Sequence, residues 1–360
     1  MVNIAHVPAA VDEVLTTFFD SGRPALDAIY PAVAEAGDVL ADFVLAGGKR
    51  VRPSFVYAGW RCGPDTAGDD TMALRVGAAI ELIQACALIH DDILDRSDTR
   101  RGNPTVHRRF EGLHAGRRLT GDSAHYGVSA AILLGDLALA WADDLVHGIG
   151  PATDGWADPR PLPRSVGVLW SRMRTEVLGG QLLDITNESS RDESVTAAYR
   201  VMEYKTAAYT VARPLQLGAA LSGADAALSG SLHRIGLDLG IAFQLRDDVL
   251  GVFGDPEQTG KPSGDDLIEG KRTALLAEGL QRASRTDGEV LRNSVGRDLS
   301  DAELTAARAV LTGSGALAEI ERQIDDRLQA ALDGIVALDV DDDARADLTW
   351  LARRITHRAR

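Results

Sequence analysis

An aspartate cluster in the first third of the chain has the composition and spacing of a metal site. The segment HDDILD at 90–95 places Asp91 and Asp95 four residues apart, so on a helix they share one face, with Asp92 beside them. Like charges at this spacing repel each other on a helix. A hard divalent cation offsets such repulsion, and Mg²⁺ typically binds one or two carboxylates together with substrate phosphates and water. The pattern therefore predicts a magnesium site.

A second cluster, QLRDDVLG at 244–251, contains Asp247 and Asp248. Each cluster ends a segment that is apolar on nearly all sides, 76–95 and 237–250, and helices of this kind lie among other helices. Carboxylates at a buried helix C-terminus oppose the helix dipole and lose hydration, so both clusters need a compensating cation. A lone acidic pair usually marks a solvated helix end, and we interpret the remaining aspartate groups in that way: Asp69–Asp70, Asp143–Asp144, Asp325–Asp326 and 341–343.

Lysine is rare in this chain, and its positions are informative. Of the 38 Lys and Arg residues only four are lysines, and each stands in a motif-like context: Lys49, Lys205, Lys261 and Lys271. Three of them lie in or beside glycine-containing loops, where a compact point charge suits a phosphate ligand. Several arginines stand close to the same motifs, among them Arg52, Arg100 and Arg101. Many cations together with two metal-binding clusters indicate diphosphate ligands.

The elements that must carry these residues are predicted to be helices, because apolar residues recur with a period of 3.6 along most of the chain. No segment shows a sustained period of two, and no internal repeat is present. No linker divides the sequence, and we expect one helical domain over 1–360. The predicted helices are 8–19, 24–46, 51–62, 70–95, 123–148, 164–188, 193–221, 225–252, 266–285, 301–335 and 342–357.

Composition narrows the function further. A net charge of −15 argues against general affinity for nucleic acid. The two cysteines, Cys62 and Cys86, are too few for a disulfide framework and suit a reducing compartment. The N-terminus lacks the order of a secretory signal, and the best apolar run, 128–141, is interrupted by Asp136. We therefore expect a soluble, cytoplasmic protein without an integral membrane segment.

Taken together, the motifs resemble the trans-isoprenyl diphosphate synthase (polyprenyl synthetase) family, most closely its geranylgeranyl diphosphate synthases. The resemblance covers residues 40–275 well and the C-terminal helices loosely. It rests on several independent motifs in the family's order: GGKRVRP, ELIQACALIHDDILD, RRG, GGQLLDI, YKT, FQLRDDVLGVFGD and TGKPSGDDLIEGKRT. It implies an all-α isoprenoid synthase fold, in which helices surround a deep central cavity, usually in a homodimer.

The resemblance also implies roles for the matching residues. Asp91 and Asp95, supported by Asp92, would bind two Mg²⁺ ions. A third Mg²⁺ would bind Asp247, helped through water by Asp248 and Asp265. The allylic diphosphate would be held by Arg100, Lys205 and Lys261, with Lys271 among the substrate-binding cations. Isopentenyl diphosphate would be held by Lys49, Arg52, Gln84 and Arg101. The reacting carbons would be faced by Thr206 and Gln244.

Two features depart from the family pattern. The second cluster often reads DDxxD, whereas its fifth position here is Gly251. Because the family's metal role falls mainly on the first aspartate, we expect activity to survive. The insertion-like segments 112–125 and 149–163 match no family role.

The expected reaction joins isopentenyl diphosphate to an allylic diphosphate with trans stereochemistry. Metal ions and cations would stabilise the negative charge that develops on the departing diphosphate. The double bond of isopentenyl diphosphate would attack the allylic carbocation-like centre, and the departed diphosphate is the expected base for the lost proton. We expect a structural role for His90.

Product length should follow from helix geometry. Cys86 and Ala87 lie five and four residues before Asp91, which is roughly 6–7.5 Å deeper along a helix. Ile83 lies about one turn further. In this family a large aromatic at 86 or 87 would plug the cavity early, and both residues are small. We therefore expect geranylgeranyl diphosphate as the main product, with farnesyl or a longer chain as the alternative.

Three rival interpretations fit the motifs less well. A class I terpene cyclase would normally carry an Asn/Asp, Ser/Thr, Glu motif as its second metal site. A non-catalytic synthase subunit should have lost acidic ligands, and Gly251 leaves this alternative open until Mg²⁺-dependent diphosphate release is measured. A purely structural helical protein does not explain where the lysines stand.

Overall fold

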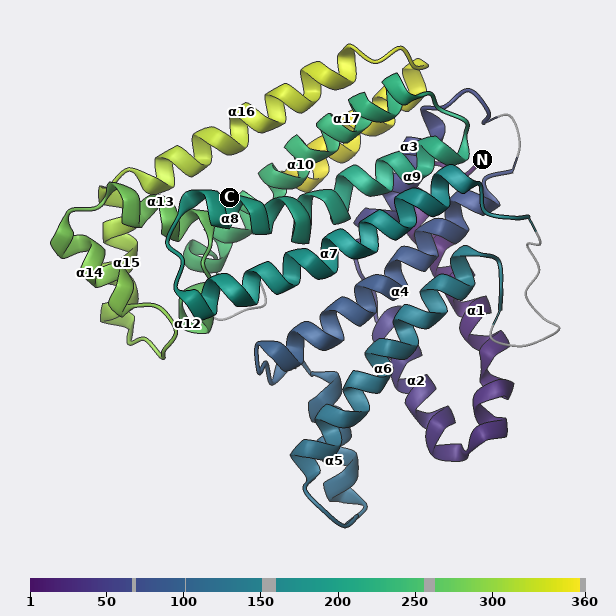
Figure 1. The fold of residues 1–360 in the computed structure, drawn as a ribbon, viewed down its shortest axis with the longest axis horizontal. Coiled ribbons are helices and arrows are strands. Elements are labelled where there is room, and N and C mark those ends of the chain that lie inside the picture. The colour runs from purple at the N-terminus through teal and green to yellow at the C-terminus, as the bar shows by residue number, and fades with distance from the viewer. Residues whose placement is uncertain (67–68, 101, 151–159, 256–262, 357–360) are drawn as a thin grey trace. The chain divides into compact units, whose positions relative to one another are not determined.

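A computed structural model describes residues 1–66, 69–100, 102–150, 160–255 and 263–356 (Figure 1). Its regular secondary structure is almost entirely helical, and the predicted all-α fold class is confirmed. Two short strands, β1 (Thr99–Arg100) and β2 (Asn103–Pro104), pair antiparallel just after the first aspartate cluster.

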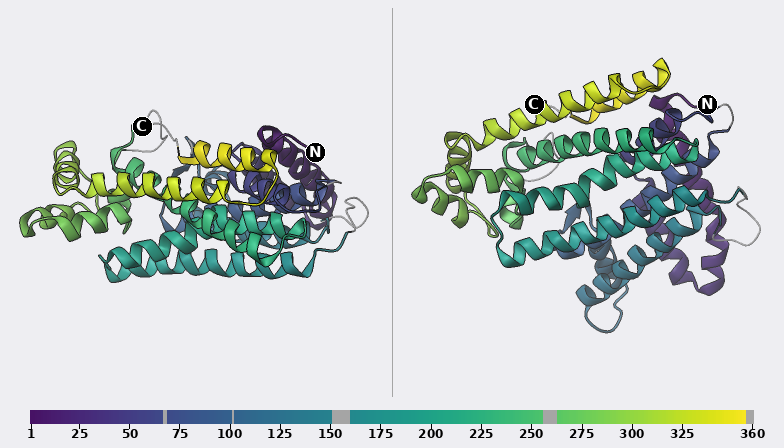
Figure 2. Two further views of the ribbon diagram at one scale, coloured as in Figure 1. Left: turned by 90° about the horizontal axis from the view of Figure 1, so that it is seen from above. Right: turned by 45° about the horizontal axis from the view of Figure 1, so that its top comes forward.

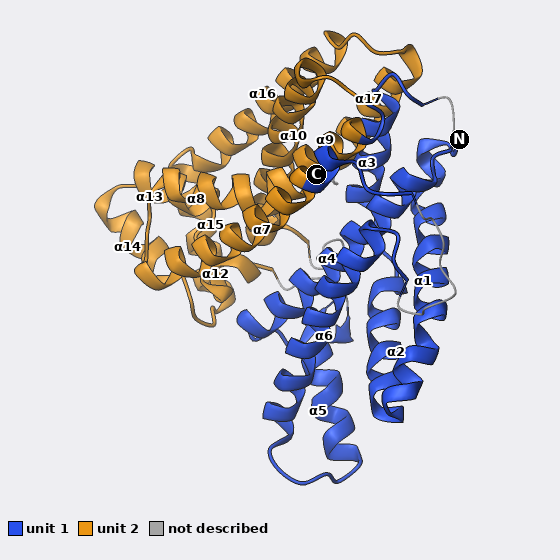
Figure 3. Cartoon of the chain, turned by 45° about the vertical axis from the view of Figure 1, so that its right-hand side comes forward, with its two compact units in different colours: residues 1–167, 221–223 blue, residues 168–220, 224–360 orange. Residues whose placement is uncertain are grey.

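The chain divides into two compact units (Figure 3). Unit 1 comprises residues 1–167 and 221–223, and unit 2 comprises residues 168–220 and 224–360. Each unit carries one of the two aspartate clusters. The single-domain organisation over 1–360 stays a prediction.

Unit 1 is built around helix α4. Its elements are η1 (Ile4–His6), α1 (Val7–Ile29), α2 (Pro31–Leu45), α3 (Val51–Arg61), α4 (Thr71–Leu94), β1, β2, α5 (Val106–Gly116) and α6 (Ser123–Val146). Helix α4 contacts α1, α2, α3, α5 and α6. Burial on nearly all sides explains its continuous apolar sequence. Phe18 of α1 and Trp141 of α6 meet edge to face with ring centroids 5.7 Å apart.

Unit 2 is built around helix α10. Its elements are α7 (Arg164–Ser190, whose first residues belong to unit 1), α8 (Val195–Val201), η2 (Met202–Ala212), α9 (Arg213–Leu221), α10 (Ala226–Phe253), α12 (Asp265–Glu269), α13 (Ala274–Arg282), α14 (Arg285–Asn293), α15 (Asp301–Gly313), α16 (Ala316–Val336) and α17 (Asp342–Thr356). Helix α10 packs against η2 and α16, and both views of Figure 2 show the short helices α12–α15 together at one end of the long ones.

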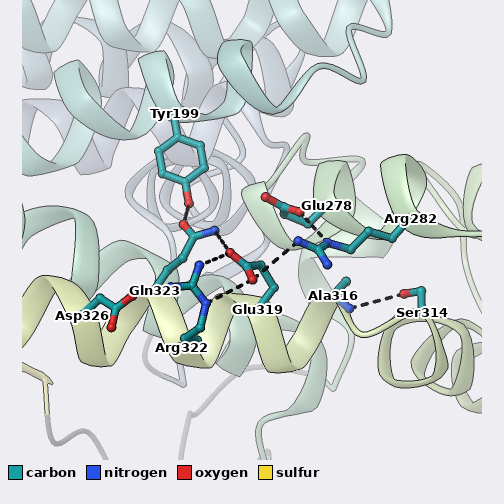
Figure 4. A network of polar contacts seen from close by, with 9 residues as sticks. All are labelled: Tyr199, Glu278, Arg282, Ser314, Ala316, Glu319, Arg322, Gln323 and Asp326. Carbon is teal, nitrogen blue, oxygen red and sulfur yellow. Dashed lines mark hydrogen bonds and ion pairs between the residues drawn. The ribbon is translucent and has the colours of Figure 1, made fainter.

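A polar network fixes α8, the helix that leads into η2. The Tyr199 hydroxyl of α8 donates a hydrogen bond to Gln323 of α16, whose amide donates to Glu319 at 2.8 Å (Figure 4). Glu319 also faces Arg282 of α13 at 3.5 Å. Arg282 in turn donates to Glu278 at 2.8 Å. Three helices are therefore joined through side chains at this point.

Several predicted helix boundaries were wrong. The break expected between 19 and 24 is absent, because α1 runs on through Pro24 and ends at Ile29. The predicted helices 266–285 and 301–335 are each divided at a glycine in the left-handed region: Gly270 with φ 89° and Gly315 with φ 80°. That conformation ends a helix and is readily adopted only by glycine. Helix α5 was not predicted.

The helix that comes nearest to a membrane span is α4, whereas the sequence indicates the run 128–141 as the best apolar stretch. Among the described residues, α4 is the one helix long and apolar enough to cross a membrane. However, 72% of its apolar window is buried inside the protein, as in the central helix of a helical bundle.

Candidate active site

The first aspartate cluster stands at the carboxyl end of α4. Asp91 lies in the last turn of the helix and Asp95 is its C-cap, so the predicted one-turn spacing is present, and both residues are partly exposed. Asp92 is 1% exposed and receives two hydrogen bonds from Arg100 Nε, at 2.8 and 3.0 Å, and an ion pair from Nη2 at 2.7 Å. Adjacent aspartates thus have different environments, because successive helical residues point about 100° apart.

Burial and ion pairing shift the pKa values of Asp92 and Arg100. Desolvation raises the pKa of the Asp92 carboxyl even though Arg100 acts to lower it. The pKa of Arg100 is also raised, because the attraction of Asp92 and then Asp91 and Asp95 outweighs its own burial. The diphosphate-binding role of Arg100 stays a prediction, and the structure shows that Arg100 holds Asp92 in place.

The predicted GGKR loop of unit 1 precedes α3. Lys49 is exposed, and Arg52 is partly exposed in the first turn of α3. This first turn contains no acidic residue, so the positive end of the helix dipole and two cations favour an anion here. Gln84 is partly exposed on α4.

In unit 2, three predicted residues form one hydrogen-bonded chain. Thr206 Oγ1 donates to Gln244 Oε1 at 2.8 Å, and Gln244 Nε2 donates to Asp248 Oδ1 at 2.9 Å. The other oxygen of Asp248 accepts from the Ala274 backbone N–H at 3.1 Å. Burial, followed by repulsion from Asp266, raises the pKa of Asp248 well above its usual range.

The neighbouring Asp247 is exposed, whereas Asp248 is 3% exposed. This pattern repeats that of the first cluster: one carboxylate faces outward and its neighbour is buried in hydrogen bonds. The outward position fits the direct metal role expected for Asp247.

Lys205 and Thr206 lie in η2, an eleven-residue π-helical stretch. π-helical turns are rare and frequent at functional sites. Lys205 Nζ donates to Asp184 of α7 at 2.6 Å. Asp184 was not among the predicted site residues, although it belongs to the GGQLLDI motif that supported the resemblance.

Glycines allow η2 to approach its neighbours backbone to backbone. A Cβ on Gly180 of α7 would lie 2.4 Å from Lys205 N. Cβ atoms on Gly236 and Gly240 of α10 would lie 2.4 Å from Cα of Ala212 and Ala207. Side chains at these positions would push η2 away from both helices, so the glycines set where Lys205 and Thr206 stand.

The departure at Gly251 has a structural counterpart. A Cβ on Gly251 would lie 1.9 Å from Asp266 Oδ2, so the carboxylate of Asp266 occupies the space beside this glycine. The role of Asp265 in assisting the metal stays a prediction, and its neighbour Asp266 lies against Gly251 of α10. Lys271 pairs with Glu269 at 2.5 Å and faces Asp266 at 4.0 Å.

The predicted chain-length residues of α4 differ in how far they are exposed. Ile83 and Cys86 are each 3% exposed, whereas Ala87 is partly exposed on the same stripe as Asp91. Cys86 Sγ lies 3.7 Å from His90 Nδ1. The His90 ring in turn packs over Gly135 of α6, where a Cβ would meet its Nε2 at 2.2 Å.

Two predicted substrate cations, Arg101 and Lys261, lie outside the described residues. The segment 112–125 forms the end of α5 and the start of α6, and 149–163 lies largely outside the described residues. Within the described chain, no group of three or more His, Cys, Asp and Glu side chains is placed to hold a metal ion. Carboxylate pairs nevertheless fit Mg²⁺, which takes much of its coordination from substrate phosphates and water.

Comparison with known proteins completes the description of the site. Residues 34–311 match the sequence profile of the polyprenyl synthetase family. A geranylgeranyl pyrophosphate synthase from Corynebacterium glutamicum, complexed with isoprenyl diphosphate and magnesium, has a TM-score of 0.91 and 43% identity and covers 99% of this chain and 100% of its own.

Two further relatives differ in the product that they are named for. A geranylgeranyl diphosphate synthase of Mycobacterium tuberculosis is 34% identical over 291 residues, which span 80% of this chain and 74% of the relative. A geranylfarnesyl diphosphate synthase of Natronomonas pharaonis is 33% identical over 287 residues, which span 76% and 75%.

Proposed function

The chain belongs to the polyprenyl synthetase family and is a trans-prenyltransferase, and we propose that its main product is geranylgeranyl diphosphate. It condenses isopentenyl diphosphate with allylic diphosphates. The observation that supports this product is the small side chain of Ala87, which lies on the partly exposed stripe of α4 one turn below Asp91. Cys86 and Ile83 are buried, so Ala87 is the position best placed to limit the hydrocarbon tail.

The two aspartate clusters would hold magnesium. Asp91 and Asp95 would bind two ions and Asp247 a third, which accounts for the proposed three per active site. When bound, Mg²⁺ stabilises negative charge on the leaving diphosphate. The buried Asp92 and Asp248 orient Arg100 and Gln244 through the hydrogen bonds described above.

The predicted substrate-binding residues fall into two groups, one for each diphosphate substrate. Lys49, Arg52 and Gln84 would hold isopentenyl diphosphate at the start of α3, where the helix dipole adds to their charge. Arg100 and Lys205 would grip the allylic diphosphate. Asp184 keeps the ammonium of Lys205 in place through its 2.6 Å hydrogen bond. On the basis of their motifs, Arg101 would join the isopentenyl diphosphate group, Lys261 would contact the allylic diphosphate, and Lys271 would be a further substrate-binding cation.

Thr206 and Gln244 would face the reacting carbons. Their mutual hydrogen bond orients the Thr206 hydroxyl and fixes the Gln244 amide, whose nitrogen is committed to Asp248. Such preorganised dipoles can stabilise developing positive charge at no reorganisation cost.

Further proposals concern assembly and location. Three apolar side chains of α6 are solvent-exposed: Leu133 at 68%, Ile132 at 44% and Tyr126 at 41%. These side chains support a homodimer, because large exposed apolar residues in groups mark interfaces. The two cysteines are free and buried, which suits a protein of the reducing cytoplasm.

The product assay tests the proposal directly. The purified protein is incubated with Mg²⁺, isopentenyl diphosphate and each of dimethylallyl, geranyl and farnesyl diphosphate, and the chain lengths are identified by mass spectrometry. We expect geranylgeranyl diphosphate from all three starters and no turnover after chelation of the metal. Farnesyl diphosphate as the sole product would refute the length argument, and absence of any condensation would favour a non-catalytic subunit.

A substitution series locates the length control. Ala87→Phe should shorten the product, because the added ring extends into the tail path one turn below Asp91. Cys86→Phe is also predicted to shorten it, although its buried site next to His90 makes misfolding a second expected effect. Ala87→Ser, which preserves size, serves as the control and should leave the product unchanged. Unchanged products from a folded Ala87→Phe protein would show that position 87 does not line the tail path.

A further inference from the structure

A buried arginine, Arg50, stands in sequence between Lys49 of the GGKR loop and Arg52 of α3. Lys49 is exposed and Arg52 partly exposed, whereas Arg50 is 5% exposed. Neither the family motif roles nor the proposed function assigns anything to Arg50. A fully charged side chain is seldom buried without a specific set of partners.

The guanidinium of Arg50 contacts three different helices of unit 1. Nη1 donates to Glu81 Oε2 of α4 at 2.7 Å, and Nε donates to Asp12 Oδ1 of α1 at 2.8 Å. Nη2 donates to the Val44 carbonyl of α2 at 2.7 Å. One side chain therefore ties the loop to the end of α2 and to two helices far away in the sequence.

The backbone of Arg50 has an unusual conformation that these contacts hold. Its φ of 44° and ψ of 44° lie in the left-handed region, which is unfavourable for a residue with a Cβ. Its carbonyl accepts hydrogen bonds from the N–H and Oγ of Ser54, at 3.1 and 2.8 Å, and so starts α3. The position of Arg52 in the first turn of α3 follows from this conformation.

Glu81, the partner of Arg50 on α4, links the loop to Gln84, the third residue proposed to bind isopentenyl diphosphate. Gln84 follows Glu81 by three residues, which places both on neighbouring faces of one helical turn. The Arg50–Glu81 pair thereby fixes the positions of Lys49 and Arg52 relative to Gln84. Stability alone is a poor explanation for the pair, because replacing a buried ion pair by apolar residues of similar volume is often neutral or stabilising.

We propose that Arg50 is a positioning residue for isopentenyl diphosphate, acting through its contacts with Glu81, Asp12 and the Val44 carbonyl. It does not touch the substrate. It keeps the loop in the one conformation in which Lys49, Arg52 and the N-terminus of α3 converge on a single diphosphate. The proposal rests on the proposed function, in which these groups bind isopentenyl diphosphate.

The double variant Arg50→Met/Glu81→Met tests the proposal. It removes one charge of each sign, so the net charge of the protein is unchanged, and it leaves no buried charge from the Arg50–Glu81 pair unpaired. With geranyl diphosphate as the second substrate, the KM for isopentenyl diphosphate should rise about tenfold or more. The KM for geranyl diphosphate and kcat should stay within about twofold. Calorimetric titration of isopentenyl diphosphate should show the same loss of affinity.

Two single variants keep the test decisive if the double variant misfolds. Asp12→Asn removes one anchor at a side chain that is 44% exposed, and it should raise the same KM by a smaller factor. Arg50→Lys keeps the charge but cannot donate to three partners, so it too should raise this KM. Glu35→Gln, which breaks an exposed pair with Arg117 elsewhere in unit 1, is the control and should change neither KM.

Direct variants separate this proposal from the proposed function. If Lys49→Ala and Arg52→Ala leave the KM for isopentenyl diphosphate unchanged, the assignment of the binding groups is wrong. If they raise it while the folded double variant, or Asp12→Asn where the double variant does not fold, keeps the wild-type KM, the positioning role of Arg50 is overturned.

Discussion

At the scale of single residues, neighbouring aspartates within each cluster differ in exposure and in hydrogen bonding. Asp247 faces outward while Asp248 is buried, and Asp91 and Asp95 are more exposed than Asp92. The consecutive aspartates are therefore not interchangeable. The outward ones can reach a ligand, and the buried ones hold Arg100 and Gln244 in fixed orientations.

Restoring the family's aspartate at position 251 should harm this protein. The Gly251→Asp side chain would collide with Asp266, whose Oδ2 lies 1.9 Å from the place that the new Cβ would take, and would add a like charge. We expect a lower Tm, by several degrees, and reduced turnover. Gly230→Asp on the same helix is the control, because the nearest atom there lies 3.9 Å away. Higher activity in Gly251→Asp would mean that Asp266 yields easily and that the missing aspartate limits the enzyme.

The thiol of Cys86 should stay protonated in the native protein well above neutral pH. Burial, followed by repulsion from Asp136, raises the pKa of Cys86 to about 11, against about 8.5 for an unfolded thiol. Because the folded pKa is raised, the stability that this thiol contributes is fully present below about pH 8.5 and is lost as the pH rises through about 11. At pH 9, iodoacetamide should label Cys86 far more slowly in native than in urea-unfolded protein, measured by peptide mass spectrometry. Equal rates would contradict the buried position.

At the scale of secondary-structure elements, the positions of Lys205 and Thr206 depend on backbone contacts of η2. Local sequence could not predict its π-helical conformation, because MEYKTAAYTVA has an ordinary helical composition. The relevant signal was in distant glycines, such as Gly180 and Gly240, and these acquire meaning only when the helices are packed together. Tyr199 adds a further support through its bond to Gln323 (Figure 4).

Two adjacent glycines of α7 offer a matched test of this packing. A Cβ on Gly180 would lie 2.4 Å from Lys205 N, whereas one on Gly179 would meet nothing within 4 Å. Gly180→Ala should therefore displace η2 and lower kcat by about tenfold or more. Gly179→Ala should leave kcat unchanged and stabilise the helix by up to about 1 kcal/mol. Steady-state kinetics and thermal unfolding of the two variants decide between this account and a general intolerance of α7 to alanine.

At the scale of the whole molecule, the sequence motifs predicted the all-α class and the family, because apolar periodicity and motif order are properties of the chain itself. Helix ends were less predictable. Gly315 interrupts a pattern that continues on both sides, and Pro24 fails to interrupt α1. The pairing of Asp92 with Arg100 depends on the turn at Arg96, where φ is 55°. No pattern in the local sequence predicts that turn.

The exposed apolar side chains of α6 predict how the protein assembles. Leu133→Glu would place a charge where Leu133 is now 68% exposed, and a dimer that buries this residue should dissociate. Sedimentation velocity should show a dimer for the wild type and a monomer for the variant. Val336→Glu is the control, because Val336 is 71% exposed on α16 but lies apart in sequence from the apolar residues of α6. If the Leu133→Glu variant is a dimer like the wild type, the interface lies elsewhere, and a monomeric wild type would contradict the proposed homodimer.

Asp91, Gln84 and Ala87, the residue proposed to limit the hydrocarbon tail, all lie on the single continuous helix α4. Because an α-helix has a fixed rise per residue, the number of residues between Asp91 and Ala87 sets the distance between them. If Ala87 limits the hydrocarbon tail as proposed, shifting a bulky side chain by one helical turn along α4 would change the product length and leave the aspartates at the end of the helix untouched.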